Sequence, residues 1–233
     1  MGFIALGVTV IAIPLLRTGK IDKGKPPRPL AEVGAFRELP FVVYNVGGFL
    51  KFLGYLIPFV YIPIYAQAHL DCSTSQAFDL LAYANAASLV GRLLAAWAAY
   101  KVGVMLPWTV CAFASGIVCL GWLAVRSLGG MIAFVVLYGF FSGALIGLPN
   151  AVLPYISPPR VLGTRMGMTF GFVAVALLIG SPIAGLLVDL RQGDFVRLQV
   201  FSGSVLLGGA SLQILLWWLI RDKIAATTAA DKK

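Results

Sequence analysis

Acidic residues are scarce in this chain, which has nine aspartates and glutamates against 18 lysines and arginines. Charged residues make up 12% and hydrophobic residues 60% of its 233 residues, whereas soluble domains average about 25% charged residues. This composition is typical of an integral membrane protein, with the lipid bilayer as its main partner. Nucleic acid is not an expected partner, because the basic residues lie in loops and form no patch with interleaved aromatic residues.

Histidine and cysteine are also few. His69 is the only histidine, and the cysteines Cys72, Cys111 and Cys119 lack the spacing of metal ligands. Their odd number leaves no closed set of disulfides. The sequence shows no hydrolase nucleophile elbow, phosphate-binding loop or dinucleotide fingerprint. We therefore expect no metal, no cofactor and no enzymatic reaction.

Long apolar runs are what the sequence has in abundance. Six runs after residue 38 each come near or exceed the ~20 residues that a membrane-spanning helix needs. The runs are Leu39–Gln67, Phe78–Tyr100, Val102–Val125, Leu128–Ile156, Met166–Val188 and Leu198–Ile220. Because the loops between them are short, consecutive helices should pack antiparallel. The sequence predicts an all-α membrane protein with a six-helix bundle over residues 39–221 and a tail over residues 222–233.

Two segments precede this bundle. Gly2–Leu16 is an uncharged run of fifteen residues, which is shorter than a full span. We expect residues 1–16 to be the end of a transmembrane helix that starts before Met1, or else a short re-entrant or interfacial helix. Arg17–Glu38 is rich in charge and carries prolines at its centre, a composition that predicts an unpacked cytoplasmic linker over residues 17–38. Contact of this linker with anionic lipids is a secondary hypothesis.

Lysines and arginines near the ends of the runs are distributed unevenly. Thirteen lie in the connector, in the loops after the second and fourth runs and in the C-terminal tail, whereas Arg126, Arg191 and Arg197 lie on the other side. Cytoplasmic loops carry the excess of basic residues. We therefore expect the connector and the C-terminus in the cytoplasm of a multi-pass protein, in the plasma membrane rather than an organelle.

Arg92 lies inside the second run, nine residues before Lys101 and therefore ~13 Å along the helix axis. Charges this deep in a hydrocarbon core of ~30 Å are rare and usually face a bundle interior or an aqueous cavity. Ser88 and Asn85 share its helical face at i−4 and i−7. We expect these three side chains to bind a substrate carboxylate, since the guanidinium fork matches that group. The alternatives are a structural tether to helix carbonyls and partial snorkelling.

Lys51 interrupts the first run and shares a helical face with Tyr44, Gly48, Tyr55 and Pro58. An ammonium beside two tyrosines suits a hydrated cavity better than lipid, so Lys51 and Tyr55 are further candidate substrate ligands. The alternatives are snorkelling and pairing with a neighbouring helix. No aspartate or glutamate lies deep in any run, so this segment supplies no carboxylate to carry a coupling proton.

Small residues and prolines mark the fourth run. Gly139, Gly143 and Gly147 lie four residues apart and predict a face for close helix packing. Pro149 and Pro154 follow in the same run and predict a kink or hinge.

In their order and spacing, SLVGRLLA, GFFSGALIGLPNAVLP, LGTRMGM and IGSPIAGLLVD resemble the C-terminal half of major-facilitator carriers of the monocarboxylate-transporter type, particularly the fungal members. The resemblance implies that residues 1–16 end helix six, that the connector is the central cytoplasmic loop and that the six runs are helices seven to twelve. It also implies that Arg92 binds a substrate anion. Such carriers bind substrate between two six-helix halves, so a missing N-terminal half is an expected partner.

The chain departs from that family pattern at two places. Proton-linked members carry an aspartate four residues before the arginine, where this chain has Ser88. The loop motif G-x-x-x-D-R-x-G is also degraded, because Ala96 and Tyr100 replace its first glycine and its aspartate, although Lys101 and Gly103 remain. Proton coupling through this helix and the usual cytoplasmic gating contact are therefore not carried over, although the resemblance as a whole implies symport.

Two functions stay open at this point. The first is secondary transport of small organic solutes, monocarboxylate-type anions in particular, by alternating access, with this chain as a fragment that forms one half of the carrier. The second is a truncated, non-transporting membrane subunit that associates with other membrane proteins through the glycine face.

Overall fold

The computed structural model describes residues 32–188 and 194–230, together with Gly7, Thr9 and Val10, and its side chains are described up to Asp222. Most of the predicted partial helix at residues 1–16 and of the connector lies outside the described residues. All the regular elements of the described part are helices, and six of them are long and apolar enough to cross a membrane. The predicted six-helix membrane fold is confirmed.

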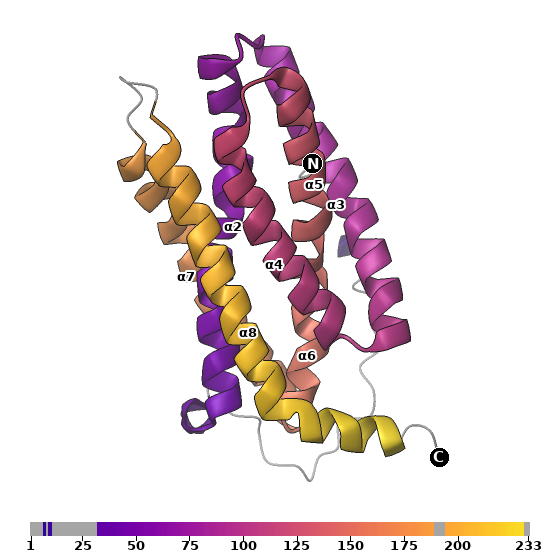
Figure 1. The fold of residues 1–233 in the computed structure, drawn as a ribbon. Coiled ribbons are helices and arrows are strands. Elements are labelled where there is room, and N and C mark those ends of the chain that lie inside the picture. The colour runs from indigo at the N-terminus through magenta and orange to yellow at the C-terminus, as the bar shows by residue number, and fades with distance from the viewer. Residues whose placement is uncertain (1–6, 8, 11–31, 189–193, 231–233) are drawn as a thin grey trace.

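Each apolar run corresponds to one long helix or to a helix continued by a shorter one. In chain order the elements are η1 (Val33–Arg37), α2 (Leu39–His69), α3 (Thr74–Val102), α4 (Met105–Gly121), η2 (Trp122–Ala124), α5 (Leu128–Gly147), α6 (Pro149–Ile156), α7 (Leu162–Leu187) and α8 (Val196–Ala230). Helix α2 lies inside the bundle against α3, α7 and α8, while α3 and α7 lie at opposite edges (Figure 1).

Local sequence determines where several helices begin and end. Ser73 caps α3 with a capping box, in which its hydroxyl accepts from the Gln76 amide at 3.3 Å and the Gln76 side chain accepts from the Ser73 amide at 3.0 Å. The Ser127 hydroxyl accepts from the Gly130 amide at the start of α5. Gly103 follows α3 with a φ of +87°, a conformation that glycine adopts without steric cost. Each of these residues marks the end of a helix, and the connections between the helices are short, as the sequence predicts.

The fourth apolar run is divided into α5 and α6. Helix α5 ends at Gly147, and α6 starts at Pro149. Proline has no amide hydrogen and its ring clashes with the preceding turn, so the hydrogen-bond ladder cannot continue through it. The predicted break in this span is therefore confirmed at Pro149.

Glycines bring α5 into direct backbone contact with α3. A Cβ atom on Gly143 would lie 2.5 Å from the carbonyl oxygen of Ser88, and one on Gly139 would clash with the carbonyl oxygen of Ala84. Gly147, the third glycine of the predicted face, has no atom within 4 Å of such a position. Two of the three glycines thus pack within the chain, and α3 covers the surface that they form.

The end of the connector belongs to the packed structure. Arg165, in the first turns of α7, is fully buried. Its guanidinium donates from Nε to Glu32 Oε2 at 2.8 Å, from Nη2 to Glu38 Oε1 at 2.6 Å and from Nη1 to the Ile156 carbonyl at 2.8 Å. Residues 32–38 are therefore tied to the start of α7 by two ion pairs, although most of their side chains are exposed.

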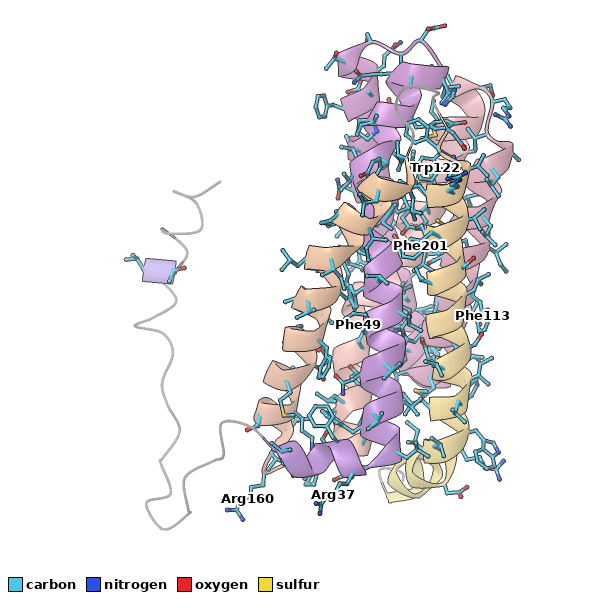
Figure 2. All side chains as sticks on the ribbon, turned by 90° about the vertical axis from the view of Figure 1, so that its left-hand side faces the viewer. Arg37, Phe49, Phe113, Trp122, Arg160 and Phe201 are labelled. Atoms are coloured by element: carbon cyan, nitrogen blue, oxygen red, sulfur yellow. The ribbon has the colours of Figure 1, made fainter. Side chains whose placement is uncertain are left out.

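Two basic residues from distant segments lie at the same end of the bundle. Arg37, at the end of η1, and Arg160, between α6 and α7, lie at one end, whereas Trp122 lies near the other (Figure 2). The end of the connector and the α6–α7 loop therefore lie on one side, as the distribution of basic residues predicts. The cytoplasmic location of this end stays a prediction.

The glycine contacts lead to a stability prediction. Gly143→Ala is expected to lower the free energy of unfolding by about 1–3 kcal/mol, since the new methyl group meets a backbone carbonyl that cannot move aside. Gly147→Ala is the matched control, and it should be neutral or stabilising by up to about 1 kcal/mol because it gains helix propensity in open space. Unfolding in mixed detergent micelles measures both values. Equal effects of the two substitutions would contradict the packing of α5 on α3.

Candidate functional site

A cavity of about 420 Å³ lies between α2, α4, α7 and the junction of α5 with α6. Its volume falls in the range of pockets that hold small organic ligands, roughly 300–1,000 Å³. Five aromatic side chains line it, namely Tyr44, Phe52, Tyr55, Trp108 and Phe170. The polar residues of the lining are Lys51, Asn150 and Thr169 together with the tyrosine hydroxyls. An apolar wall with a few polar groups is the usual composition of a ligand site.

Lys51 is the charged residue of this cavity, and its side chain is 3% exposed. Its ammonium donates to Gln213 Oε1 at 2.6 Å and lies 3.9 Å from the centre of the Trp108 ring. Gln213 Nε2 in turn donates to Thr109 Oγ1 at 3.2 Å, and Thr109 Oγ1 donates to the Met105 carbonyl. This chain of donors points the amide oxygen of Gln213 towards the lysine.

Helix α8 provides both the space for Lys51 and its acceptor. A Cβ atom on Gly209 would lie 2.6 Å from Lys51 Cγ and 2.6 Å from the Gly47 carbonyl oxygen. The lysine stem therefore crosses α8 where a glycine leaves room, and Gln213 follows one helical turn later. Any larger residue at position 209 would displace either the stem or α2.

Lys51 has no carboxylate partner in the described part of the chain. Within the described residues, the ion pairs join Arg165 to Glu32 and Glu38, and Arg221 to Asp222. A buried ammonium that has only a neutral acceptor and an aromatic face is costly. An anionic ligand in the cavity would therefore stabilise the protonated form of Lys51.

Arg92 lies on the exposed face of α3 and reaches the edge of this cavity through Tyr55. Its guanidinium is close enough to the Tyr55 hydroxyl for an electrostatic interaction, and the Ser142 hydroxyl approaches the same oxygen. Tyr55 lines the cavity one helical turn after Lys51. The structure thus relates three of the predicted ligands, Lys51, Tyr55 and Arg92, to one region of the bundle.

The other two predicted ligands lie elsewhere on α3. Ser88 is buried at the contact with Gly143 of α5, and its hydroxyl has no hydrogen-bond partner among the described residues. Asn85 is exposed, and its amide donates to the Leu81 carbonyl of its own helix at 2.9 Å. Neither residue lines the cavity.

The structure adds residues that the sequence analysis did not select. Gln213 was detectable as an amide within an apolar run, whereas Trp108 and Thr169 gave no signal, because an apolar residue and a hydroxyl are both common inside membrane helices. Arg165 was counted among the loop charges because the fifth run was predicted to begin after it. Its helix begins at Leu162, which places Arg165 inside the bundle.

The unbalanced charge leads to a prediction. Lys51→Met is expected to raise the melting temperature of the detergent-solubilised chain, because methionine can follow the same path past Gly209 without an ammonium to desolvate. Lys101→Met, at the exposed end of α3, is the control and should leave the melting temperature unchanged. A clear fall for Lys51→Met would show that Gln213 and Trp108 compensate the charge in full.

Comparison with known proteins places this bundle in a family. The family described as "Major Facilitator Superfamily" matches residues 1–168. The chain is 35% identical over 213 residues to the aspyridones efflux protein of Emericella nidulans, a match that covers 91% of this chain and 43% of that protein. It is 35% identical over 216 residues to an MFS-type transporter of Aspergillus niger, covering 92% of this chain and 50% of that protein.

A third relative is the agnestins efflux protein of Paecilomyces divaricatus, which is 32% identical over 212 residues, or 88% of this chain and 48% of that protein. The chain therefore spans about half the length of the curated relatives it matches. The monocarboxylate-transporter subtype stays a prediction. Six membrane-spanning helices and these matches together show that the chain is an integral multi-pass membrane protein that belongs to the major facilitator superfamily.

Proposed function

We propose that this chain forms the C-terminal half of a secondary carrier that moves small organic anions across a membrane by alternating access. The observation that supports this proposal most directly is the buried ammonium of Lys51, which lines a cavity and has no carboxylate partner among the described residues. A charge held in this way is costly to the fold and is characteristic of a substrate pathway in a membrane protein.

In this proposal Arg92 is the first contact for the anion. It lies on the exposed face of α3 beside Tyr55, and superfamily carriers bind substrate between their halves near the middle of the bilayer. The guanidinium fork would accept a carboxylate in two parallel hydrogen bonds. The Tyr55 hydroxyl would also contact the anion, and Tyr55 connects this position to the cavity that Lys51 lines. Asn85, also exposed on α3, remains a candidate for the rim of this site.

The remaining parts of the proposal concern motion, coupling and location. The break between α5 and α6 at Pro149 provides a place where one wall of the cavity can bend. Symport would require a proton carrier other than a deep carboxylate in the described helices, since Asp79 lies in the first turns of α3 and Asp222 at the end of the membrane-spanning part of α8. We propose a plasma-membrane carrier with its C-terminus in the cytoplasm and an N-terminal six-helix half as its partner.

The alternative of a non-transporting subunit is weakened by the glycine contacts. That hypothesis assigned association with other proteins to Gly139, Gly143 and Gly147, but α3 already covers the first two. A partner at this face would have to displace α3 from its backbone contacts with α5. The observation favours a packing role within the chain and leaves the alternative without its proposed interface.

A transport assay tests the role of Arg92. The chain is joined to the N-terminal half of the Emericella nidulans relative, and uptake of labelled carboxylates of increasing size, from pyruvate to 2-naphthoate, is measured in proteoliposomes. Arg92→Ala is expected to reduce uptake by about tenfold or more, because a charge-assisted pair contributes ~1.5–3 kcal/mol. Arg160→Ala, which removes an exposed loop arginine, should retain full uptake. Undiminished uptake by a well-expressed Arg92→Ala protein would contradict the assigned role.

A further inference from the structure

We propose that the cavity around Lys51 is a binding subsite for an aromatic carboxylic acid that carries a second hydrogen-bond acceptor. The inference rests on the proposed function and narrows its substrate class, because a three-carbon acid would leave most of this cavity unfilled. Lys51 would pair with the carboxylate, while Trp108 and Thr169 would donate to the second acceptor.

The lysine has hydrogen-bonding capacity left for a carboxylate. An ammonium has three donors, and Gln213 Oε1 is the one acceptor that the described residues provide for it. A carboxylate offers two oxygens and a full negative charge. It would therefore satisfy the remaining donors and supply the negative charge that the described residues do not place beside Lys51.

Two residues of the lining carry a buried polar atom that has no partner within the described residues. The atoms are the indole Nε1 of Trp108, a residue that is only 2% exposed, and the hydroxyl Oγ1 of Thr169. Buried donors are normally paired, since an unpaired one has lost its hydrogen bonds to water without replacement. Both residues line the same cavity as Lys51, and in this proposal a ligand that enters the cavity supplies the missing acceptors.

The remaining wall matches a flat apolar body. Tyr44, Phe52, Tyr55 and Phe170 contribute aromatic surface, and rings pack favourably against rings in offset or edge-to-face arrangements. Tyr44 is held in place because its hydroxyl donates to the Pro149 carbonyl at 2.9 Å. The volume of about 420 Å³ accommodates a fused bicyclic acid.

A binding experiment tests the subsite without requiring transport. The purified chain in lipid nanodiscs is melted with and without 6-hydroxy-2-naphthoate, and a ligand that binds the folded state raises the melting temperature. We expect a clear rise for this probe and a smaller one for 2-naphthoate, which lacks the hydroxyl. Pyruvate and the uncharged 6-hydroxy-2-naphthamide should give little or no rise.

Substitutions then locate the bound probe. Lys51→Met should weaken binding of 6-hydroxy-2-naphthoate by about tenfold or more, whereas the matched control Lys101→Met should retain it. Thr169→Val keeps the shape of the side chain and removes its hydroxyl, so it should reduce the response to 6-hydroxy-2-naphthoate towards that of 2-naphthoate, with Trp108 as the remaining donor. Partition of the probe into lipid is the same for all variants and cancels in the comparison.

The outcomes separate this inference from the proposed function. Equal responses of the wild-type, Lys51→Met and Thr169→Val proteins would overturn the subsite, as would a response to pyruvate that exceeds the response to the naphthoates. Lys51-dependent binding of the naphthoate, combined with unchanged uptake by Arg92→Ala, would support the subsite and overturn only the role assigned to Arg92. If uptake depends on Arg92 but the naphthoate does not bind, the carrier function stands and the subsite is overturned.

Discussion

Close contact between helix backbones at glycine residues is the constraint on which this bundle depends. Apolar side chains bring little gain when helices associate within lipid, so van der Waals contact between closely approaching backbones becomes the main source of stability. Gly91, Gly139 and Gly143 join α3 to α5 in this way, and Gly54 does the same for α2 against the Ser202 turn of α8. The Ser202 hydroxyl adds a hydrogen bond of 2.9 Å to the Gly54 carbonyl.

The same kind of contact creates the site. Where α2 crosses α8 at Gly209, the missing side chain leaves room for the stem of a lysine, and the helix turn that follows carries its acceptor. Lys51 is therefore held beside the cavity without interrupting the packing of α2 on α8. The free-energy cost of burying Lys51 is offset by the packing of the surrounding helices. This is usual where a membrane protein buries a charge that has a function.

Helical periodicity predicted much of this arrangement because it identifies residues that share a face. It correctly gave six spans, the break at Pro149 and two basic residues within the spans. Periodicity does not say which neighbour a face will meet, and this is why Ser88 could be grouped with Arg92 although it is buried against Gly143. Contacts between distant segments, such as Lys51 with Gln213, follow from tertiary packing and have no local sequence signature.

The pairing of Arg165 with Glu32 and Glu38 also joins α7 to the segment that precedes α2. The connector from Arg17 to Glu38 has 22 residues, but its last seven are fastened to the base of α7. Because Glu32 and Glu38 precede α2 directly and are bound to the start of α7, a displacement of α7 would also pull on the segment that leads into α2.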